Sequence, residues 1–208
     1  NWRYNVFVLG LTGSIGMGKT TAAKFFRCNK IPVYNSDDVV HQILGKNGIA
    51  VKPVGEVFQG VISGNQVDRN ALGKQVFSDT RALSVLEKIL HPMVRARQKE
   101  FLMTAAKSRI SLVVLEIPLL FETGGEINCD AVAVVSAPQH LQKTRVMSRP
   151  RMTEKKFRAI SSRQLEDHEK RRLADFIIPT GLGKRTSLRA IKNIVRAVTG
   201  IKGTAWSP

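Results

Sequence analysis

Short apolar runs alternate with helical patterns along this chain, and together they predict its architecture. Five runs are almost continuously apolar, as expected for strands that helices cover on both faces. These runs are Val6–Thr12, Ile31–Tyr34, Leu112–Ile117, Ala131–Ser136 and Phe176–Ile178. Strands that alternate with helices are typical of a parallel sheet, so the predicted fold class is α/β.

Apolar residues at helical spacing predict the helices. One helix follows the first strand over Lys19–Phe26, and Asp79 can cap a second one. Pro92 fits the first turn of a third helix, because a helix start leaves its N–H groups unpaired anyway. A last helix covers Leu188–Val198 and stops at Gly200. About 75 mostly helical residues separate the second and third strands, which predicts a helical insertion at the ligand-facing end of the sheet.

The composition adds a strong positive charge. The 208 residues include 33 Lys and Arg against 16 Asp and Glu, giving a formal net charge of +17. Such a chain attracts polyanions, which include nucleic acid, anionic membrane surfaces and polyphosphorylated small molecules. Aromatic residues make up only 6% of the chain, which argues against a base-stacking surface for nucleic acid.

Neither a membrane span nor a metal cluster is predicted. The longest apolar run, residues 111–121, is interrupted by Glu116 and Pro118. Cys28 and Cys129 have neither a CxxC spacing nor a metal-ligand spacing. This cysteine usage favours a reducing compartment, so we expect a cytoplasmic protein.

Residues 13–20, Gly-Ser-Ile-Gly-Met-Gly-Lys-Thr, fit the phosphate-loop pattern G-x-x-x-x-G-K-[ST] between a predicted strand and a predicted helix. Glycines let backbone N–H groups converge on phosphate oxygens, and the following helix adds the positive end of its dipole. Lys19 can bridge the β- and γ-phosphates, and the Thr20 hydroxyl can ligate Mg²⁺. The predicted ATP-binding residues in this region are Gly13, Gly16, Met17, Gly18, Lys19, Thr20 and Thr21.

Phosphate loops serve kinases, GTPases and motor-like ATPases, so other residues must separate these classes. The chain has no guanine-reading N-K-x-D sequence, which disfavours a GTPase. A motor-like ATPase usually has a strand that ends in adjacent acidic residues, whereas the third strand offers only Glu116.

Asp37 and Asp38 lie just past the second strand, at the edge where open α/β sheets bind ligands. A carboxylate there can accept a hydroxyl proton and help to hold Mg²⁺. Asp37 is the first candidate for both roles, and Asp38 is the second. The alternative for one of the two aspartates is a helix N-cap.

Arg145 and Arg149 are four residues apart on a predicted helix, so their guanidinium groups would project from one face. They open a strongly charged stretch, residues 144–173. This stretch fits a solvated helix pair, and it also fits a lid whose arginines close on the transferring phosphoryl group. The residues alone leave both possibilities open.

Beyond the phosphate loop, six segments resemble the dephospho-CoA kinase family. In chain order they are IPVYNSDDVVHQI, VDRNALGKQVF, LHPMVR, IPLLFE, SRPRMTEKKF and RQLEDHEKRRLADFII. With the loop they extend from Val8 to about Gly181, and they are far more specific than the loop. The resemblance implies a P-loop kinase fold, in which a five-stranded parallel sheet carries a helical acceptor-binding region and a helical lid.

The resemblance also implies the reaction, which is transfer of the γ-phosphoryl group of ATP to the ribose 3′-hydroxyl of dephospho-CoA with Mg²⁺. This reaction is the last step of coenzyme A biosynthesis. Asp37 would be the base, Arg145 the lid arginine at the phosphates, and Arg149 a lid residue near the nucleotide. The residues that match positions lining or supporting the acceptor site are His91, Arg95, Pro118, Leu119, Leu120, Phe121 and Glu122.

On this basis we expect a single domain of three parts. The core comprises about residues 1–40, 108–144 and 172–200, the helical acceptor-binding region about 41–107, and the lid about 145–171. ATP and dephospho-CoA are polyanions, which accounts for part of the positive charge. No specific nucleic-acid partner is expected.

Three positions depart from the family pattern. Asn35 replaces the first aspartate of the D-A-D sequence whose second aspartate matches Asp37, and Glu116 stands where the family usually has aspartate. The sequence IIPTG replaces the usual I-D-N-x-G after the last strand, which affects the nucleotide contacts expected near Pro179 and Thr180. Because Lys19, Thr20, Asp37 and Arg145 are all present, we expect an active enzyme.

Two other functions stay open from the sequence. A kinase for a different small acceptor, such as a nucleoside, would share the core but not the HPMVR and IPLLFE segments. A nucleic-acid-binding ATPase would account for the charge, and it predicts steeply salt-dependent binding.

Overall fold

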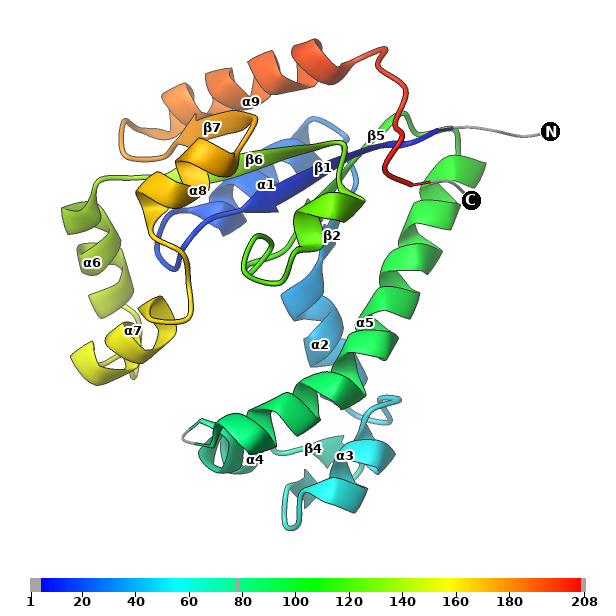
Figure 1. The fold of residues 1–208 in the computed structure, drawn as a ribbon, viewed down its shortest axis with the longest axis vertical. Coiled ribbons are helices and arrows are strands. Elements are labelled where there is room, and N and C mark those ends of the chain that lie inside the picture. The colour runs from blue at the N-terminus through cyan, green and yellow to red at the C-terminus, as the bar shows by residue number, and fades with distance from the viewer. Residues whose placement is uncertain (1–4, 78, 207–208) are drawn as a thin grey trace. The chain divides into compact units, whose positions relative to one another are not determined.

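The computed structural model describes residues 5–77 and 79–206. Its main sheet has five parallel strands in the order β2-β5-β1-β6-β7 (Figure 1). The strands are β1 (Phe7–Thr12), β2 (Val33–Asn35), β5 (Leu112–Glu116), β6 (Ala131–Ser136) and β7 (Phe176–Pro179). All five predicted strands are therefore confirmed, and the fold class is α/β as expected.

The chain divides into two compact units. One comprises residues 1–34 and 102–208 and contains the sheet, and the other comprises residues 35–101. The helices of the sheet unit are α1 (Lys19–Cys28), α6 (Gln139–Met147), α7 (Glu154–Ser161), α8 (Asp167–Leu173), α9 (Lys184–Val198) and the 3₁₀ helix η1 (Gly125–Asn128).

The sheet unit buries apolar residues on both faces of the sheet. Leu9 and Leu11 of β1 pack with Phe26 of α1 and Ile191 of α9, while Val132 of β6 packs on the opposite face. Because successive side chains of a strand point to opposite faces, continuous apolar runs are what this two-sided core requires.

The second unit is mostly helical, with one small hairpin. It contains α2 (Ser36–Leu44), α3 (Val51–Val57), β3 (Ile62–Ser63), β4 (Gln66–Val67), α4 (Arg69–Val76) and most of α5 (Thr80–Lys107). The antiparallel β3–β4 hairpin was not predicted. In the sequence, the Gly64-Asn65 pair indicates a tight turn between the two short strands. In the structure, Gly64 has a φ of 59°, as this kind of turn requires.

The prediction of two helices around Pro92 is wrong, because α5 continues through this proline. Proline removes one backbone hydrogen bond and is usually placed at a helix start. Here a helix of 28 residues retains enough other hydrogen bonds and packing to contain it. The start of α5 is confirmed, since Asp79 Oδ1 accepts the N–H groups of Arg81 at 2.8 Å and Ala82 at 3.1 Å.

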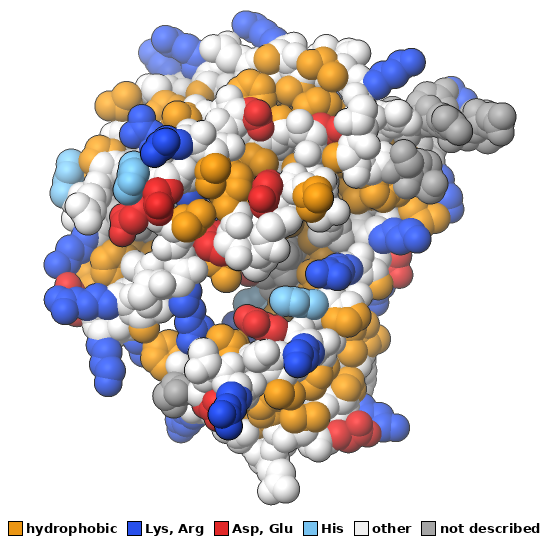
Figure 2. Space-filling model, viewed as in Figure 1, with side chains coloured by type: hydrophobic (Ala, Val, Ile, Leu, Met, Phe, Trp, Pro, Cys, Tyr) orange, Lys and Arg blue, Asp and Glu red, His pale blue; other side chains and the backbone are white. Residues whose placement is uncertain are grey.

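Basic side chains are spread over the face of the molecule that Figure 2 shows. Figure 2 shows Lys and Arg side chains distributed around the visible face, with acidic groups between them. Within residues 5–77 and 79–206, no helix is both long and apolar enough to cross a membrane.

Candidate active site

The phosphate loop connects β1 to α1 as predicted, and its shape depends on glycine. Gly16 and Gly18 have φ values of 78° and 92°, a conformation that other residues rarely adopt. A Cβ atom on Gly16 would lie 2.6 Å from Val146 Cγ2 of α6. Gly18 is the N-cap of α1, and no side chain caps this helix. The N-terminal end of α1 is therefore open to an anionic ligand.

Lys19 begins α1 and reaches to the end of a neighbouring strand. Its Nζ lies 3.2 Å from Oε1 of Glu116, the last residue of β5. The Glu116 side chain is 1% exposed and the Lys19 side chain 15% exposed. Glu116 stands where the family usually has aspartate, and in this structure its carboxylate forms an ion pair with the lysine of the phosphate loop. The hydroxyls of Thr20 and Thr21 lie in the exposed first turn of α1.

Asp37 and Asp38 lie in the first turn of α2, in the second unit, and both are exposed. The N-cap of α2 is Asn35, whose Oδ1 accepts the N–H groups of Asp37 at 2.9 Å and Asp38 at 3.1 Å. The alternative that one of the aspartates is the cap is therefore wrong. Asn35 takes that position, which leaves both carboxylates exposed at a helix start.

His91 and Arg95 lie four residues apart on α5, also in the second unit. Both are exposed, and residues at this spacing share one helix face. His91 lies in the interior of α5, so the possibility that it marks a helix start is excluded.

The segment after β5 lies in the sheet unit and contains the remaining predicted acceptor residues. Pro118 and Leu119 are half-buried. Leu120 is fully buried and packs against Val132 and Val134 of β6. Its side chain therefore supports the segment from within the core.

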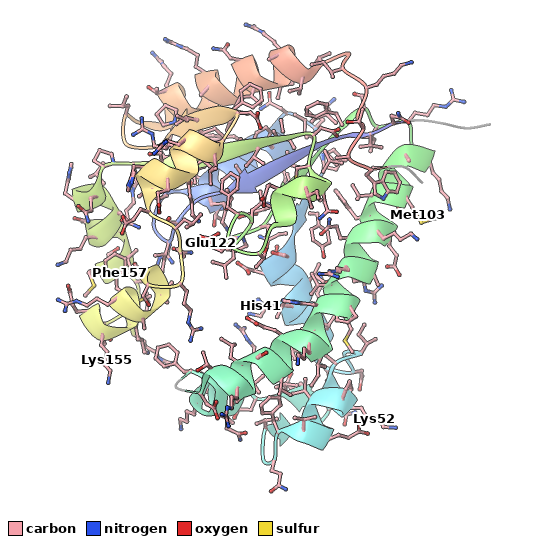
Figure 3. The ribbon with its side chains drawn as sticks, in the orientation of Figure 1. His41, Lys52, Met103, Glu122, Lys155 and Phe157 are labelled. Atoms are coloured by element: carbon pink, nitrogen blue, oxygen red, sulfur yellow. The ribbon has the colours of Figure 1, made fainter. Side chains whose placement is uncertain are left out.

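Glu122 ends this segment in a buried ion pair that the sequence analysis missed. Its carboxylate Oε1, on the residue labelled in Figure 3, lies 2.8 Å from Lys170 Nζ and accepts the Leu165 N–H at 2.8 Å. Lys170 of α8 is fully buried, although it lies in the strongly charged stretch of residues 144–173. No local pattern marks such a lysine, because its partner comes from a distant segment.

Two glutamines hold the tip of the phosphate loop. The Ile15 N–H donates to Gln164 Oε1 at 2.9 Å, and Gln142 Nε2 donates to the Ile15 carbonyl at 2.9 Å. The Ser14 hydroxyl donates to the Leu165 carbonyl at 3.4 Å. The segment between α7 and α8 therefore contacts both the phosphate loop and, through Leu165, Glu122.

The prediction that Arg145 and Arg149 share one helix face is wrong. Arg145 lies on α6, but the helix ends at Met147 and Arg149 follows it, exposed. Pro150 accounts for this end, since a residue before proline is disfavoured in the helical region. Arg145 donates to the Thr180 carbonyl at 2.7 Å and to the Gly16 carbonyl at 3.4 Å.

A cavity of about 670 Å³ opens beside the phosphate loop within the sheet unit. Its lining includes Ser14 and Met17 of the loop, Gln142 of α6 and Phe157 of α7, the last of which is labelled in Figure 3. This volume is in the range of small-molecule sites.

Burial makes the Cys129 thiol a poor nucleophile. Burial raises the pKa of the Cys129 thiol to about 12, and the negative charges of Asp130 and Glu126 add to the shift. The thiol therefore stays protonated at neutral pH. Cys28 is free and exposed at the far end of α1.

Comparison with known proteins places these features in one family. A family model described as dephospho-CoA kinase matches residues 7–182. The dephospho-CoA kinase of Paramagnetospirillum magneticum is 50% identical over 198 residues, which cover 95% of this chain and 93% of that protein.

Two solved structures share the fold. A Thermus thermophilus protein, TT1252, matches with a TM-score of 0.81 and 33% identity, over 94% of this chain and 100% of the other. Dephospho-CoA kinase from Campylobacter jejuni matches with a TM-score of 0.68 and 26% identity, over 92% and 96% of the two chains.

Proposed function

This chain belongs to the dephospho-CoA kinase family, and from that premise we propose which of its residues carry the reaction. The enzyme uses ATP to phosphorylate dephospho-CoA in coenzyme A biosynthesis. The acceptor is the ribose 3′-hydroxyl, and the products are coenzyme A and ADP. The observation that supports the site most directly is the glycine loop of residues 13–20, which presents Lys19 beside Glu116 at the open start of α1.

The phosphate loop binds the phosphates of ATP in this proposal. Its backbone N–H groups and the first turn of α1 bind phosphate oxygens, and Lys19 contributes a positive charge at the β- and γ-phosphates. The Lys19 side chain is 15% exposed, so in this proposal it leaves or shares the Glu116 carboxylate when ATP binds. Arg145 lies on α6 and Arg149 lies just after it. In this proposal, closure of the lid brings both guanidinium groups to the phosphates.

Asp37 is the proposed base. As the 3′-hydroxyl oxygen forms its bond to the γ-phosphorus, the bond from that phosphorus to the β,γ-bridging oxygen breaks and ADP leaves. The hydroxyl proton passes to the Asp37 carboxylate, which is exposed in the first turn of α2.

Mg²⁺ fits the oxygen donors that the chain offers. Within the described residues, no three His, Cys, Asp or Glu side chains gather as a metal cage. Mg²⁺ in kinases needs no cage, since one or two protein oxygens and the substrate phosphates hold it with water. The Thr20 hydroxyl and the Asp37 carboxylate are the proposed donors. The bound ion would neutralise charge on the transferring phosphoryl group.

The residues proposed for acceptor binding lie on α5 and in the segment after β5. His91 and Arg95 offer exposed groups on one face of α5 for the anionic part of dephospho-CoA. Pro118 and Leu119 offer a half-buried apolar surface, while Leu120 and Glu122 support it from within the sheet unit.

The free thiols of Cys28 and Cys129 support a reducing, cytoplasmic location.

The reaction is tested by ADP release from Mg-ATP with and without dephospho-CoA, together with the mass of the product. We expect acceptor-dependent ADP release and a gain of one phosphate. ADP release that occurs only with nucleosides or nucleic acid would contradict the proposed acceptor.

The base is tested by Asp37→Asn, with Asp38→Asn as the matched control because both aspartates lie in the same exposed helix turn. Asp37→Asn should lower kcat by at least about a hundredfold while ATP binding stays nearly intact. The control should keep most of the activity. Normal turnover in Asp37→Asn would exclude Asp37 as the base.

A further inference from the structure

Three consecutive carbonyl groups of the phosphate loop accept hydrogen bonds from side chains outside the loop. The pairs are Gln142 Nε2 to the Ile15 carbonyl at 2.9 Å, Arg145 Nη1 to the Gly16 carbonyl at 3.4 Å, and Thr180 Oγ1 to the Met17 carbonyl at 2.5 Å. The first two donors come from α6, and Thr180 directly follows β7. All of these residues belong to the sheet unit.

These bonds fix the direction of the loop N–H groups. In a planar trans peptide the C=O and the N–H point in opposite directions. A donor that holds the Ile15 carbonyl therefore turns the Gly16 N–H away from α6. A donor that holds the Met17 carbonyl turns the Gly18 N–H away from Thr180 in the same way. N–H groups of this glycine-rich loop are the groups that bind phosphate oxygens.

Thr180 is itself held firmly in place. Its N–H donates to the Ser136 carbonyl at 2.8 Å, and its own carbonyl accepts Arg145 Nη2 at 2.7 Å. A hydroxyl has one proton to donate, and the Met17 carbonyl is closer to Oγ1 than the Ser136 carbonyl at 3.2 Å. Oγ1 can also accept Arg145 Nη1 at 3.3 Å. The hydroxyl proton is thus assigned to the phosphate loop.

We propose that Thr180 and Gln142 are positioning residues that orient the phosphate loop for the phosphates of ATP. The inference rests on the proposed function, because it deepens the role of the same loop. It also gives the departure at IIPTG a physical meaning. Thr180 follows the last strand where the family sequence differs, and its side-chain hydroxyl contacts the phosphate loop from there.

The test compares Thr180→Val with Thr180→Ser. Valine keeps the shape of threonine but removes the hydroxyl, so the nearly buried Met17 carbonyl loses its donor. We expect the Kd for ATP and for inorganic tripolyphosphate to rise about tenfold, typical of losing one buried hydrogen bond. Serine keeps the hydroxyl and should bind both ligands within about twofold of the unsubstituted enzyme. Tripolyphosphate isolates phosphate recognition from contacts with the base.

A matched control separates positioning from general stability. Ser187 of α9 is buried, and its hydroxyl donates to the Pro179 carbonyl at 2.7 Å without contacting the phosphate loop. Ser187→Ala should lower the Tm but leave the KM for ATP unchanged. Thr180→Val should raise the KM for ATP while the KM for dephospho-CoA stays constant.

Gln142→Met provides a second variant if Thr180→Val fails to fold, and it should weaken tripolyphosphate binding in the same direction. The proposal is overturned if Thr180→Val and Gln142→Met lower the Tm as Ser187→Ala does but bind ATP and tripolyphosphate normally. It is also overturned if the unsubstituted enzyme does not bind tripolyphosphate. An enzyme that binds both ligands but does not phosphorylate dephospho-CoA would contradict the proposed function alone.

Discussion

Two of the lysine–glutamate pairs in the sheet unit differ in how much of the lysine side chain is exposed. Lys19 and Glu116 lie 3.2 Å apart, and the lysine side chain is 15% exposed. Lys170 and Glu122 lie 2.8 Å apart, and the lysine is fully buried. In the proposed site the first lysine exchanges its partner for a phosphate, whereas the second lysine has a structural role only.

The difference follows from where each lysine lies. Lys19 is the first residue of a helix whose start no side chain caps, so its ammonium is at the open end of the sheet. Lys170 lies within α8, in the interior of the sheet unit. Removing a partner from a buried charge is costly, while a partly exposed charge can turn to water.

The largest effect is expected where the lysine is most buried. Glu122→Gln leaves the Lys170 charge without a counter-charge, which should lower the free energy of unfolding by about 3–5 kcal/mol. Chemical denaturation measures this loss. The double variant Glu122→Gln with Lys170→Met should recover most of it, because neither charge is then buried alone. A single variant within about 1 kcal/mol of the original protein would contradict the structural role of this pair.

Lys19 should show its effect in catalysis instead. Lys19→Met removes the charge proposed to act on the β- and γ-phosphates, so kcat should fall at least about a hundredfold, or about 2.7 kcal/mol. ADP release in the presence of dephospho-CoA measures it. Lys24→Met is the control, since Lys24 is an exposed lysine of the same helix. If both variants keep kcat within threefold of the original (about 0.7 kcal/mol), Lys19 has no such role.

Glu116→Gln makes the same substitution at the other pair, and it should lower the free energy of unfolding by less than Glu122→Gln does. The amide is neutral and easier to bury than a carboxylate, and the Lys19 side chain can reach solvent. Denaturation of both variants under the same conditions gives the comparison directly. Equal losses would mean that exposure of the lysine does not distinguish the two pairs.

The two pairs also show which parts of the site can be predicted from sequence. Lys19 belongs to a continuous motif between a strand and a helix, so its position follows from local pattern alone. Lys170 does not, because its burial depends on Glu122 in a distant segment and on the packing of α8. Its neighbours along the chain are charged and exposed, such as Arg171. Tertiary context decides the environment of such a residue.

The same distinction holds for the fold. Strands were predicted well because two-sided burial makes each of them continuously apolar, as in β6. The predictions of helix ends were wrong where they depended on one residue, such as a proline, and not on the packing of the whole helix. Pro92 was read as a helix start although α5 continues through it, and Arg149 was placed on a helix that ends before Pro150. In α2 the cap was Asn35 rather than an aspartate, since several residues there could serve.

An exposed pair completes the comparison and carries the smallest expected effect. Arg97 and Glu100 of α5 lie 2.9 Å apart, close to the 2.8 Å of Lys170 and Glu122, but their side chains are 47% and 63% exposed. Glu100→Gln should change the free energy of unfolding by only about 0.3–0.5 kcal/mol, because water solvates both charges when they separate. Chemical denaturation in low and in high salt measures this change in the free energy of unfolding. The change should be smaller in high salt, because salt screens the two charges. At two ion pairs of nearly equal length, removing the glutamate charge would then cost about ten times more where the lysine is buried, so burial rather than distance sets the cost of breaking the pair. A loss at Glu100 as large as that at Glu122 would reverse this conclusion.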